Sequence, residues 1–175
     1  NALHRVIQYS MGWYNCHLYQ FELPNELILV ETSDEVEEYS WMNQLSTFDG
    51  NIRTKKTYRV SKNVKVDKYV KVGQVIPYIY DMGDYWEHLI TVEKIIEDYP
   101  HVYPICLEGE GACPPEDCGG VVGYLDLLEI IENPAHEEYE TLMEWLEESQ
   151  YDTSFDLEET NWWMKETLKL KRPKK

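Results

Sequence analysis

Three of the four cysteines lie in one irregular stretch, residues 106–124, CLEGEGACPPEDCGGVVGY. They are spaced C-x6-C-x4-C among glycines, which let the backbone bend close to a metal, and thiolates are ligands that zinc prefers. Neither spacing is the short turn that usually grips zinc, so we favour free cysteines buried as small apolar residues, or a loop held by backbone hydrogen bonds. Zinc is the alternative. Its predicted ligands are Cys106, Cys113, Cys118 and His88, with His101, His17 and Cys16 as further candidates for the fourth position.

A second group of candidate residues is acidic and divides between an expected hairpin and the same cysteine-rich stretch. Carboxylates beside an imidazole can bind a hard metal ion or act as acid and base. Turn aspartates, however, usually accept hydrogen bonds from backbone amides, and Glu116 with Asp117 can cap the next helix or brace the loop. We favour bracing, because no Ser or Lys lies in a recognisable nucleophile setting. The catalytic candidates are Asp84, Glu87, His88, Glu116 and Asp117, with Asp81 nearby in the sequence.

Other signs point to binding rather than catalysis. The sequence contains no phosphate-binding GxxxxGK[ST], no GxGxxG after a strand, no HExxH and no GxSxG. Its 6 Trp and 14 Tyr exceed what a core normally uses, so some rings are expected to line a surface or a cleft. Trp162 and Trp163 are adjacent in an expected helix and cannot both face one core, so one of them can mark a partner surface. We therefore expect a non-enzymatic module for an unknown protein partner.

The charge distribution limits the classes of partner. A formal charge of −17 opposes docking on a phosphate backbone unless a local basic patch outweighs it. The basic run Arg53–Lys71 holds eight of the sixteen Lys and Arg residues. We interpret it as solubilising charge on strands and loops, with a dock for nucleic acid as the alternative. No apolar run is long enough to span a membrane and no signal segment opens the chain, so we expect a cytoplasmic protein without a membrane partner.

Alternating and helical spacings locate the elements that must position these residues. Helical spacing predicts a helix from Leu3 to Ser10, with Gly12 as its left-handed cap. Alternation within Trp13–Leu23 predicts a strand that ends at Pro24-Asn25 and returns through Leu27 to Val30 as a hairpin. A second hairpin is predicted over 75–80 and 86–97 around the turn Asp81-Met82-Gly83-Asp84. In the last strand Trp86 and His88 share a face. The acidic run Glu31–Glu38 is expected to be a solvated loop or a helix face.

Three helices are expected towards the C-terminus. The first carries Tyr124, Leu127, Leu128 and Ile131 at helical spacing and ends at Asn133-Pro134. This dipeptide can also begin the second helix, with Asn133 as its N-cap and Pro134 in its first turn. The third opens at Asp156 with Glu159 as its capping-box partner. Residues 169–175 form a basic tail that is expected to fray.

The strings around the candidate sites resemble a known family. YDMGDYWEH at 80–88 and YPICLEGEGACPPEDCGGVVGYLDLLEII at 103–131 are similar to the family named for open reading frame three of the Ri plasmid. LHRVIQYSMGWYNCHLYQF at 3–21, NPAHEEY and FDLEETN are similar too, so the resemblance covers nearly the whole chain. The family has no agreed catalytic residues. The positions that match its motifs are Asp81, Gly83, Asp84, Trp86, His88, Pro114, Pro115, Glu116, Asp117, Gly119 and Gly120.

The resemblance implies one α+β domain over residues 1–175, found in plasmid, transposon-passenger and chromosomal proteins without an assigned role. Family members usually begin with a strand before the first helix. That strand is absent here and the chain begins at Asn1 rather than Met, so we expect further residues upstream. Met82 stands where the family often has Phe. With the element pattern, this predicts a mostly antiparallel sheet, an N-terminal helix and about three C-terminal helices.

The leading expectation is thus a cytoplasmic binding or interaction module associated with plasmids or mobile elements, with the cysteine-rich stretch packed against the YDMGD hairpin. One alternative is a metal-dependent or carboxylate–histidine enzyme of the hydrolase type. The other is an accessory protein that associates with nucleic acid through Arg53–Lys71.

Overall fold

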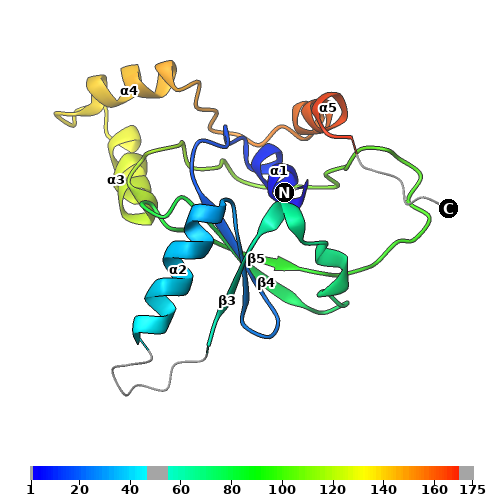
Figure 1. Cartoon of the computed structure of the whole chain (residues 1–175). Helices are drawn as coiled ribbons and strands as arrows, with labels where there is room; N and C mark the ends of the chain where they lie inside the picture. The colour runs from blue at the N-terminus through cyan, green and yellow to red at the C-terminus, as the bar shows by residue number, and fades with distance from the viewer. Residues whose placement is uncertain (1, 47–54, 170–175) are drawn as a thin grey trace. The chain divides into compact units, whose positions relative to one another are not determined.

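A computed structural model describes residues 2–46 and 55–169 of the chain, whose contacts divide it into two compact units. The sheet unit comprises His17–Asp98, and the helical unit comprises Ala2–Cys16 together with Tyr99–Lys175. Figure 1 labels the helices α1–α5 and the strands β3–β5. The expected α+β composition is confirmed.

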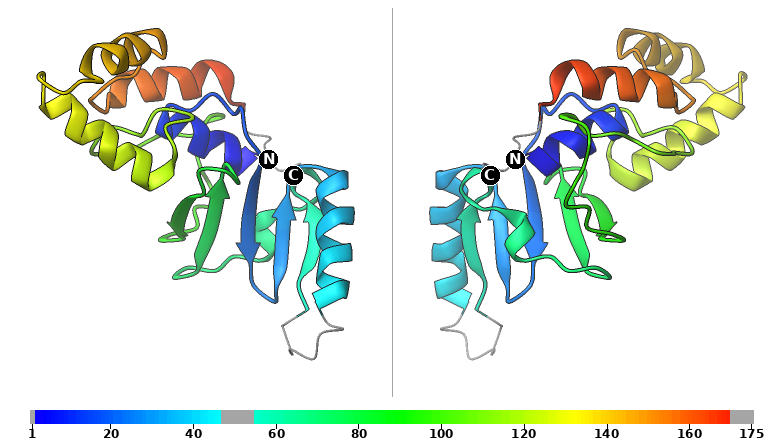
Figure 2. Two further views of the ribbon diagram at one scale, coloured as in Figure 1. Left: turned by 90° about the vertical axis from the view of Figure 1, so that its left-hand side faces the viewer. Right: turned by 90° about the vertical axis from the view of Figure 1, so that its right-hand side faces the viewer.

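The sheet unit is built on five strands in the order β3-β2-β1-β4-β5 (Figure 2). They are β1 (Tyr19–Leu23), β2 (Leu27–Val30), β3 (Thr57–Val60), β4 (Val75–Tyr80) and β5 (Trp86–Thr91). All neighbours are antiparallel except β2 and β3, which are parallel. The prediction of a mostly antiparallel sheet is therefore confirmed, while the parallel edge strand lies in a segment for which only strands and loops in general were expected.

Both expected hairpins form. Leu23 pairs with Leu27, so the three residues Pro24, Asn25 and Glu26 connect β1 to β2, and Asn25 and Glu26 have left-handed φ values of 62° and 56°. Strand β5 ends at Thr91, so the prediction of a strand to residue 97 is wrong. The reason is the partner segment: Thr91 pairs with Val75, the first residue of β4, and Val92 bonds to Gly73 and Gln74, where the chain turns through a 2.9 Å bond from the Gln74 amide to the Lys71 carbonyl.

Aromatic rings fill one face of the sheet. Phe21 and Tyr78 lie side by side with ring centroids 4.7 Å apart, and Tyr19 is within 5.7 Å of Phe21. The hydroxyl of Tyr19, which is fully buried, shares a 2.7 Å hydrogen bond with Ser61 in the 3-10 helix η1 (Ser61–Asn63). A second 3-10 helix, η2 (Val66–Lys68), follows. The hydrogen bond satisfies the polar ends of two buried side chains at the margin of the sheet.

The acidic run 31–38 contributes to helix α2 (Ser33–Ser46), which packs against β3. Thr32 and Glu35 form its capping box: Thr32 Oγ1 accepts from the Glu35 amide at 3.2 Å, and Glu35 Oε2 accepts from the Thr32 amide at 2.9 Å. Of the two expectations for this run, the helix is confirmed and the loop is wrong.

The helical unit contains α1 (Ala2–Met11), α3 (Gly120–Glu132), α4 (Tyr139–Glu148) and α5 (Leu157–Thr167). Helix α1 packs against α5, and α3 packs against α4. Gly12 has φ +78°, and the amide of Trp13 donates to the carbonyl of Gln8 at 3.0 Å. This is the 6→1 bond of a Schellman motif, so the predicted cap of α1 is confirmed.

The start of α4 differs from the prediction. Its first residue is Tyr139, so Asn133 does not cap this helix. The amide of Glu138 donates to His136 Nδ1 at 3.2 Å, and Asn133 accepts the His136 amide in an isolated turn. These local bonds compete with the helical ladder until Tyr139. The cap of α5 is confirmed, because Asp156 Oδ1 accepts the Glu159 amide at 2.9 Å.

Candidate functional site

The cysteine-rich loop is anchored to the end of α1 within the helical unit. The indole Nε1 of Trp13 donates to the carbonyl of Pro114 at 2.9 Å, and the amide of Tyr14 donates to Glu116 Oε1 at 3.0 Å. Trp13 is 6% exposed and follows the capping glycine, so the Schellman motif that ends α1 also places this anchor. Glu116 thus braces the loop, as predicted.

Helix α5 holds the beginning of the loop. Asn161 Oδ1 accepts the Cys106 amide at 2.8 Å, and Asn161 Nδ2 donates to the Cys106 carbonyl at 2.9 Å. Gly109 packs closely against the ring of Phe155: a Cβ at this position would lie 2.5 Å from that ring. The loop is therefore a built structure with fixed ends rather than a loose connection.

Glycines let the loop turn directly into α3. Gly119 and Gly120 have φ values of 89° and 67°, which L side chains rarely adopt. Gly123 faces the loop backbone so closely that a Cβ would lie 1.9 Å from the carbonyl oxygen of Cys118. The positive φ values explain why the motif has glycine at positions 119 and 120, and the close contact explains the glycine at position 123.

A cavity of about 660 Å³ lies in the helical unit between α1, the loop and the start of α5. Two kinds of side chain dominate its lining. Its aromatic residues are Tyr9, Trp13, Tyr14, Tyr151, Phe155 and Trp163. Its acidic residues are Glu108, Glu110, Glu116, Asp152, Asp156 and Glu159. The predicted use of surplus aromatic residues to line a cleft is borne out here, and the volume is typical of sites that take small-molecule or peptide-sized ligands.

Several groups in and near the cavity are held in their neutral form. Burial, followed by the nearby Glu116 carboxylate, raises the pKa of the Cys113 thiol well above its usual range. Burial also raises the pKa of Tyr151, to which a hydrogen bond with Tyr124 contributes. A thiol kept protonated is a poor nucleophile, so Cys113 acts as a wall of the cavity.

The other thiols of the loop make weak hydrogen bonds to its backbone. Cys106 Sγ donates to the carbonyl of Glu108 at 3.3 Å, and Cys118 Sγ donates to that of Gly120 at 4.0 Å. Inside either unit, among residues 2–46 and 55–169, no three His, Cys, Asp or Glu side chains bring ligand atoms within 4.8 Å of one another. His88 belongs to the sheet unit, so the zinc set that combines it with the three cysteines stays a prediction.

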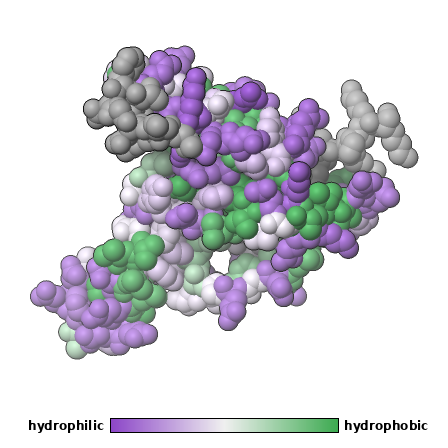
Figure 3. Space-filling model, turned by 90° about the horizontal axis from the view of Figure 1, so that it is seen from below, coloured by the Kyte–Doolittle hydropathy of each residue, from purple (hydrophilic) through white to green (hydrophobic). Residues whose placement is uncertain are grey.

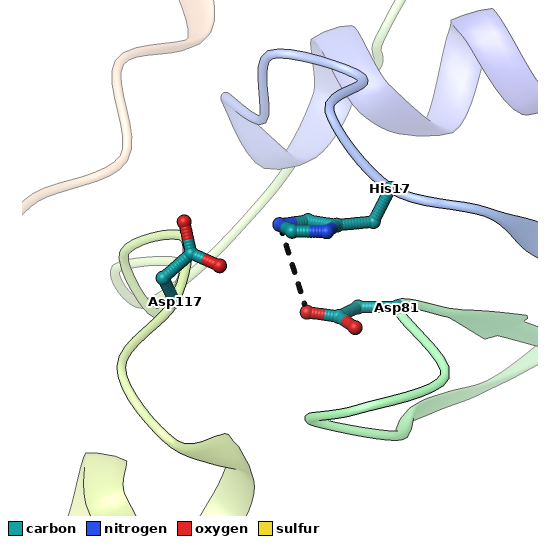
Figure 4. Close-up of side chains that lie close together, drawn as sticks. All are labelled: His17, Asp81 and Asp117. Carbon is teal, nitrogen blue, oxygen red and sulfur yellow. Dashed lines mark ion pairs between the residues drawn. The ribbon is translucent and has the colours of Figure 1, made fainter.

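In the sheet unit, His17 and Asp81 face each other across two strand ends (Figure 4). His17 Nε2 lies 3.7 Å from Asp81 Oδ2, and the His17 amide donates to the Tyr80 hydroxyl at 3.3 Å. His17 comes just before β1 and Asp81 directly after β4, and Tyr19 pairs with Tyr80. Sequence reasoning considered the two residues separately; the antiparallel pairing of their strands is the signal that brings them together.

The hairpin candidates do not share one face. Trp86 and His88 lie on the same face of β5, as predicted, with His88 against the Tyr78 ring at 5.4 Å, while Glu87 points to the opposite side and is exposed. The ring Nδ1 of His88 donates to the Trp86 carbonyl at 3.0 Å, and burial lowers its pKa. Because Glu87 and His88 diverge, these two residues do not form an acid–base pair.

Asp81, another motif position of the hairpin, has a role in its turn. Asp81 Oδ1 accepts the Gly83 amide at 2.8 Å, an Asx-turn of the kind expected for a turn aspartate. Glu116 and Asp117 belong to the helical unit, and Asp117 has φ +60° in the loop. Catalytic roles for Asp84, Glu87, His88, Glu116 and Asp117 stay predictions.

The described part of the basic run contains the short strand β3, the 3-10 helices η1 and η2, and the segments that connect them. Arg53 lies outside the described residues, and residues 57–60 form β3. Lys56 Nζ lies 3.6 Å from Glu22 Oε1 on β1. This ion pair fits the interpretation of the run as charge that complements the acidic remainder, while the nucleic-acid dock stays a prediction.

Exposed apolar side chains also occur outside the cavity. Figure 3 shows green patches of apolar residues among hydrophilic ones on the face seen from below. On the hairpin β4–β5 the exposed apolar residues include Val75 and Leu89, and on α2 they include Trp41 and Met42. None of the helices in the described ranges combines the length and apolar character that crossing a bilayer requires.

Comparison with known proteins identifies a family, a relative and a solved structure to which the chain is similar. A family model described as "Plasmid pRiA4b ORF-3-like protein" matches residues 1–161. The "Uncharacterized protein y4hQ" of Sinorhizobium fredii (strain NBRC 101917 / NGR234) is 33% identical over 154 residues, which cover 88% of this chain and 71% of that protein. A crystal structure of "Protein of Unknown Function MM3350" from Methanosarcina mazei Go1 has a TM-score of 0.66 and 29% identity, covering 89% of this chain and 79% of that one.

Proposed function

The chain belongs to the family of plasmid pRiA4b ORF-3-like proteins, and we propose that it is a non-enzymatic cytoplasmic binding module for a partner protein. The cavity of the helical unit is its binding site. Because the family carries no assigned activity, the proposal depends on the residues of this chain and not on a relative's function.

The single observation that carries the proposal is the cavity of about 660 Å³ with six aromatic side chains in its lining. Aromatic residues are the commonest anchors of protein interfaces, because they bury a large area and lose little conformational freedom. Trp163 is 44% exposed and Tyr14 is 63% exposed, so both rings retain surface that a ligand can cover.

The anchoring of the loop supports a site that exists before its ligand arrives. Pro114 is held by the Trp13 indole, and Cys106 is held by the Asn161 side chain. A cavity whose walls are already fixed pays less ordering entropy on binding than a loop that must fold around a ligand. The loop therefore contributes shape rather than reactive groups.

The state of the cysteines supports the proposed compartment. No disulfide joins Cys16, Cys106, Cys113 or Cys118. Cysteines that persist as thiols are typical of a reducing environment such as the cytoplasm.

Adjacent tryptophans on α5 provide the test. Trp163 lines the cavity, whereas Trp162 is similarly exposed and does not. Peptides selected from a displayed random dodecapeptide library should bind the wild-type chain, and Trp163→Ala should weaken them about tenfold or more, as expected for an aromatic anchor. Trp162→Ala should weaken the peptides less than Trp163→Ala does, because the Trp162 ring does not line the cavity but only contacts the Trp163 ring, with ring centroids 4.7 Å apart. Fluorescence polarisation of the labelled peptides measures both.

The proposal fails if the library yields no binding peptide. It also fails if the selected peptides depend on Trp162 and not on Trp163. Unchanged thermal melting of both variants shows that the comparison reports binding rather than folding.

A further inference from the structure

The charge of the cavity lining identifies a class of ligand. We infer that the cavity takes a lysine- or arginine-bearing segment of the partner protein, an inference that rests on the proposed function and names the chemistry of its ligand. Six of its lining side chains are carboxylates, and none of the described residues that line it is Lys, Arg or His. A cationic segment is complementary to such walls, whereas an acidic segment or a phosphate backbone meets like charge.

Four of these carboxylates are already fixed by the protein. Glu116 accepts the Tyr14 amide at 3.0 Å and Asp156 accepts the Glu159 amide at 2.9 Å. Asp152 accepts from Ser154, and Glu159 accepts from the Trp163 indole at 3.3 Å. A carboxylate has about four acceptor positions, so each can still accept a bond from an ammonium or guanidinium group. These oxygens are acceptors held in place before a cation arrives.

Glu108 and Glu110 are carboxylates that the cysteine-rich loop contributes to the cavity lining. They flank Gly109, which is packed on the Phe155 ring, so the backbone that carries both carboxylates is fixed. Both side chains are exposed. They are therefore positioned to meet the charged head of a ligand, while its aliphatic stem covers aromatic rings of the lining.

The aromatic walls favour a cationic side chain over a bare metal ion. The ring faces of Tyr14 and Trp163 provide no ligand atom for a metal, but they attract an ammonium or guanidinium group through the cation–π interaction. The volume of about 660 Å³ gives room for a short stretch of peptide rather than one ion. The formal charge of −17 adds long-range attraction for the same class of partner.

The test compares three labelled peptides on the full chain: GGKRKGG, GGQQQGG and GGEEEGG. The basic peptide should bind more tightly than the neutral one, and the acidic one should not bind. Because the whole chain is acidic, general attraction must be separated from the site by a matched pair of variants. Glu108→Gln with Glu110→Gln removes two charges from the cavity, and Glu147→Gln with Glu148→Gln removes two exposed charges from α4 of the same unit.

We expect the cavity variant to weaken the basic peptide about tenfold, as for two partly exposed ion pairs, and the α4 variant to weaken it less than about twofold. Equal weakening by the two variants overturns the inference, because binding then follows overall charge. It is also overturned if library peptides that depend on Trp163 lack Lys and Arg. That result leaves the proposed binding module standing, whereas the absence of any peptide that depends on Trp163 removes both.

Discussion

At the scale of single residues, Gly123 shows a contact that reverses an intrinsic preference. Helix propensity alone makes alanine about 1 kcal/mol better than glycine inside a helix. In α3 the added Cβ would lie 1.9 Å from the Cys118 carbonyl oxygen, which belongs to the backbone and cannot rotate away. For alanine at position 123 the cost of the steric clash therefore exceeds the gain in helix propensity.

Gly123→Ala is accordingly expected to lower the free energy of unfolding by about 1–3 kcal/mol, the range for overpacking a tight site. Urea denaturation followed by far-UV circular dichroism measures the change. Val122→Ala, at an exposed neighbour on the same helix, serves as control and should stay within about 0.5 kcal/mol. A midpoint for Gly123→Ala at or above that of the wild type would contradict the predicted clash.

His4 is a second residue whose environment has a measurable consequence. Its side chain is 2% exposed, and its Nε2 is hydrogen-bonded to Asn15 Oδ1. Burial lowers the pKa of His4 to about 4, with the Asn15 bond acting in the opposite direction. The folded chain thus holds this imidazole neutral at pH values where the unfolded chain protonates it.

The sign of the pH effect follows from that difference. Below pH 6.5 the unfolded state binds the additional proton, so folded-state stability is lost as the pH falls towards 4. His4 should account for a loss of about 2 kcal/mol between pH 7 and pH 5. Urea unfolding at both pH values should show this slope in the wild type and in His101→Gln, an exposed control, and a smaller slope in His4→Gln. Equal slopes in all three chains would refute the assignment.

At the scale of elements, local signals predicted most of the fold. Gly12 ends α1, Asp156 caps α5, and both hairpins turn where Pro24-Asn25 and Asp81–Asp84 predicted a turn. For helix α2 the sequence did not distinguish a helix from a loop, because its many charges leave no clear apolar face. Thr32 and Glu35 nevertheless have the spacing of a capping box. The parallel pairing of β2 with β3 connects segments far apart in sequence, for which no local signal exists.

The clasp between α5 and the loop gives an element-scale prediction. Asn161 both accepts from and donates to the backbone of Cys106. Asn161→Leu loses both hydrogen bonds and should lower the free energy of unfolding by about 1–3 kcal/mol. Asn161→Asp keeps only the bond from the Cys106 amide, so its free energy of unfolding should lie between those of the wild type and Asn161→Leu. Hydrogen exchange at this amide should be fast in the leucine variant and slow in the aspartate variant; equal protection in both would rule out the clasp.

At the scale of the whole chain, the candidate site could be predicted only in part. The sequence indicated a built loop braced by Glu116 and a surplus of aromatic residues for a cleft. It did not indicate which segments meet there, since Trp13 and Pro114 are 101 positions apart. Cavity walls of this kind arise from tertiary packing and leave no periodic pattern. The zinc set and the packing of the loop against the hairpin stay predictions.

The clasp at residue 106 also bears on how sequences of this kind can vary. Asn161 recognises the peptide groups of position 106 and not its sulfur atom. Another residue at position 106, or a covalent reporter on its side chain, can therefore keep both hydrogen bonds to Asn161, whereas a substitution of Asn161 cannot. Selection on this pair should act on one partner only.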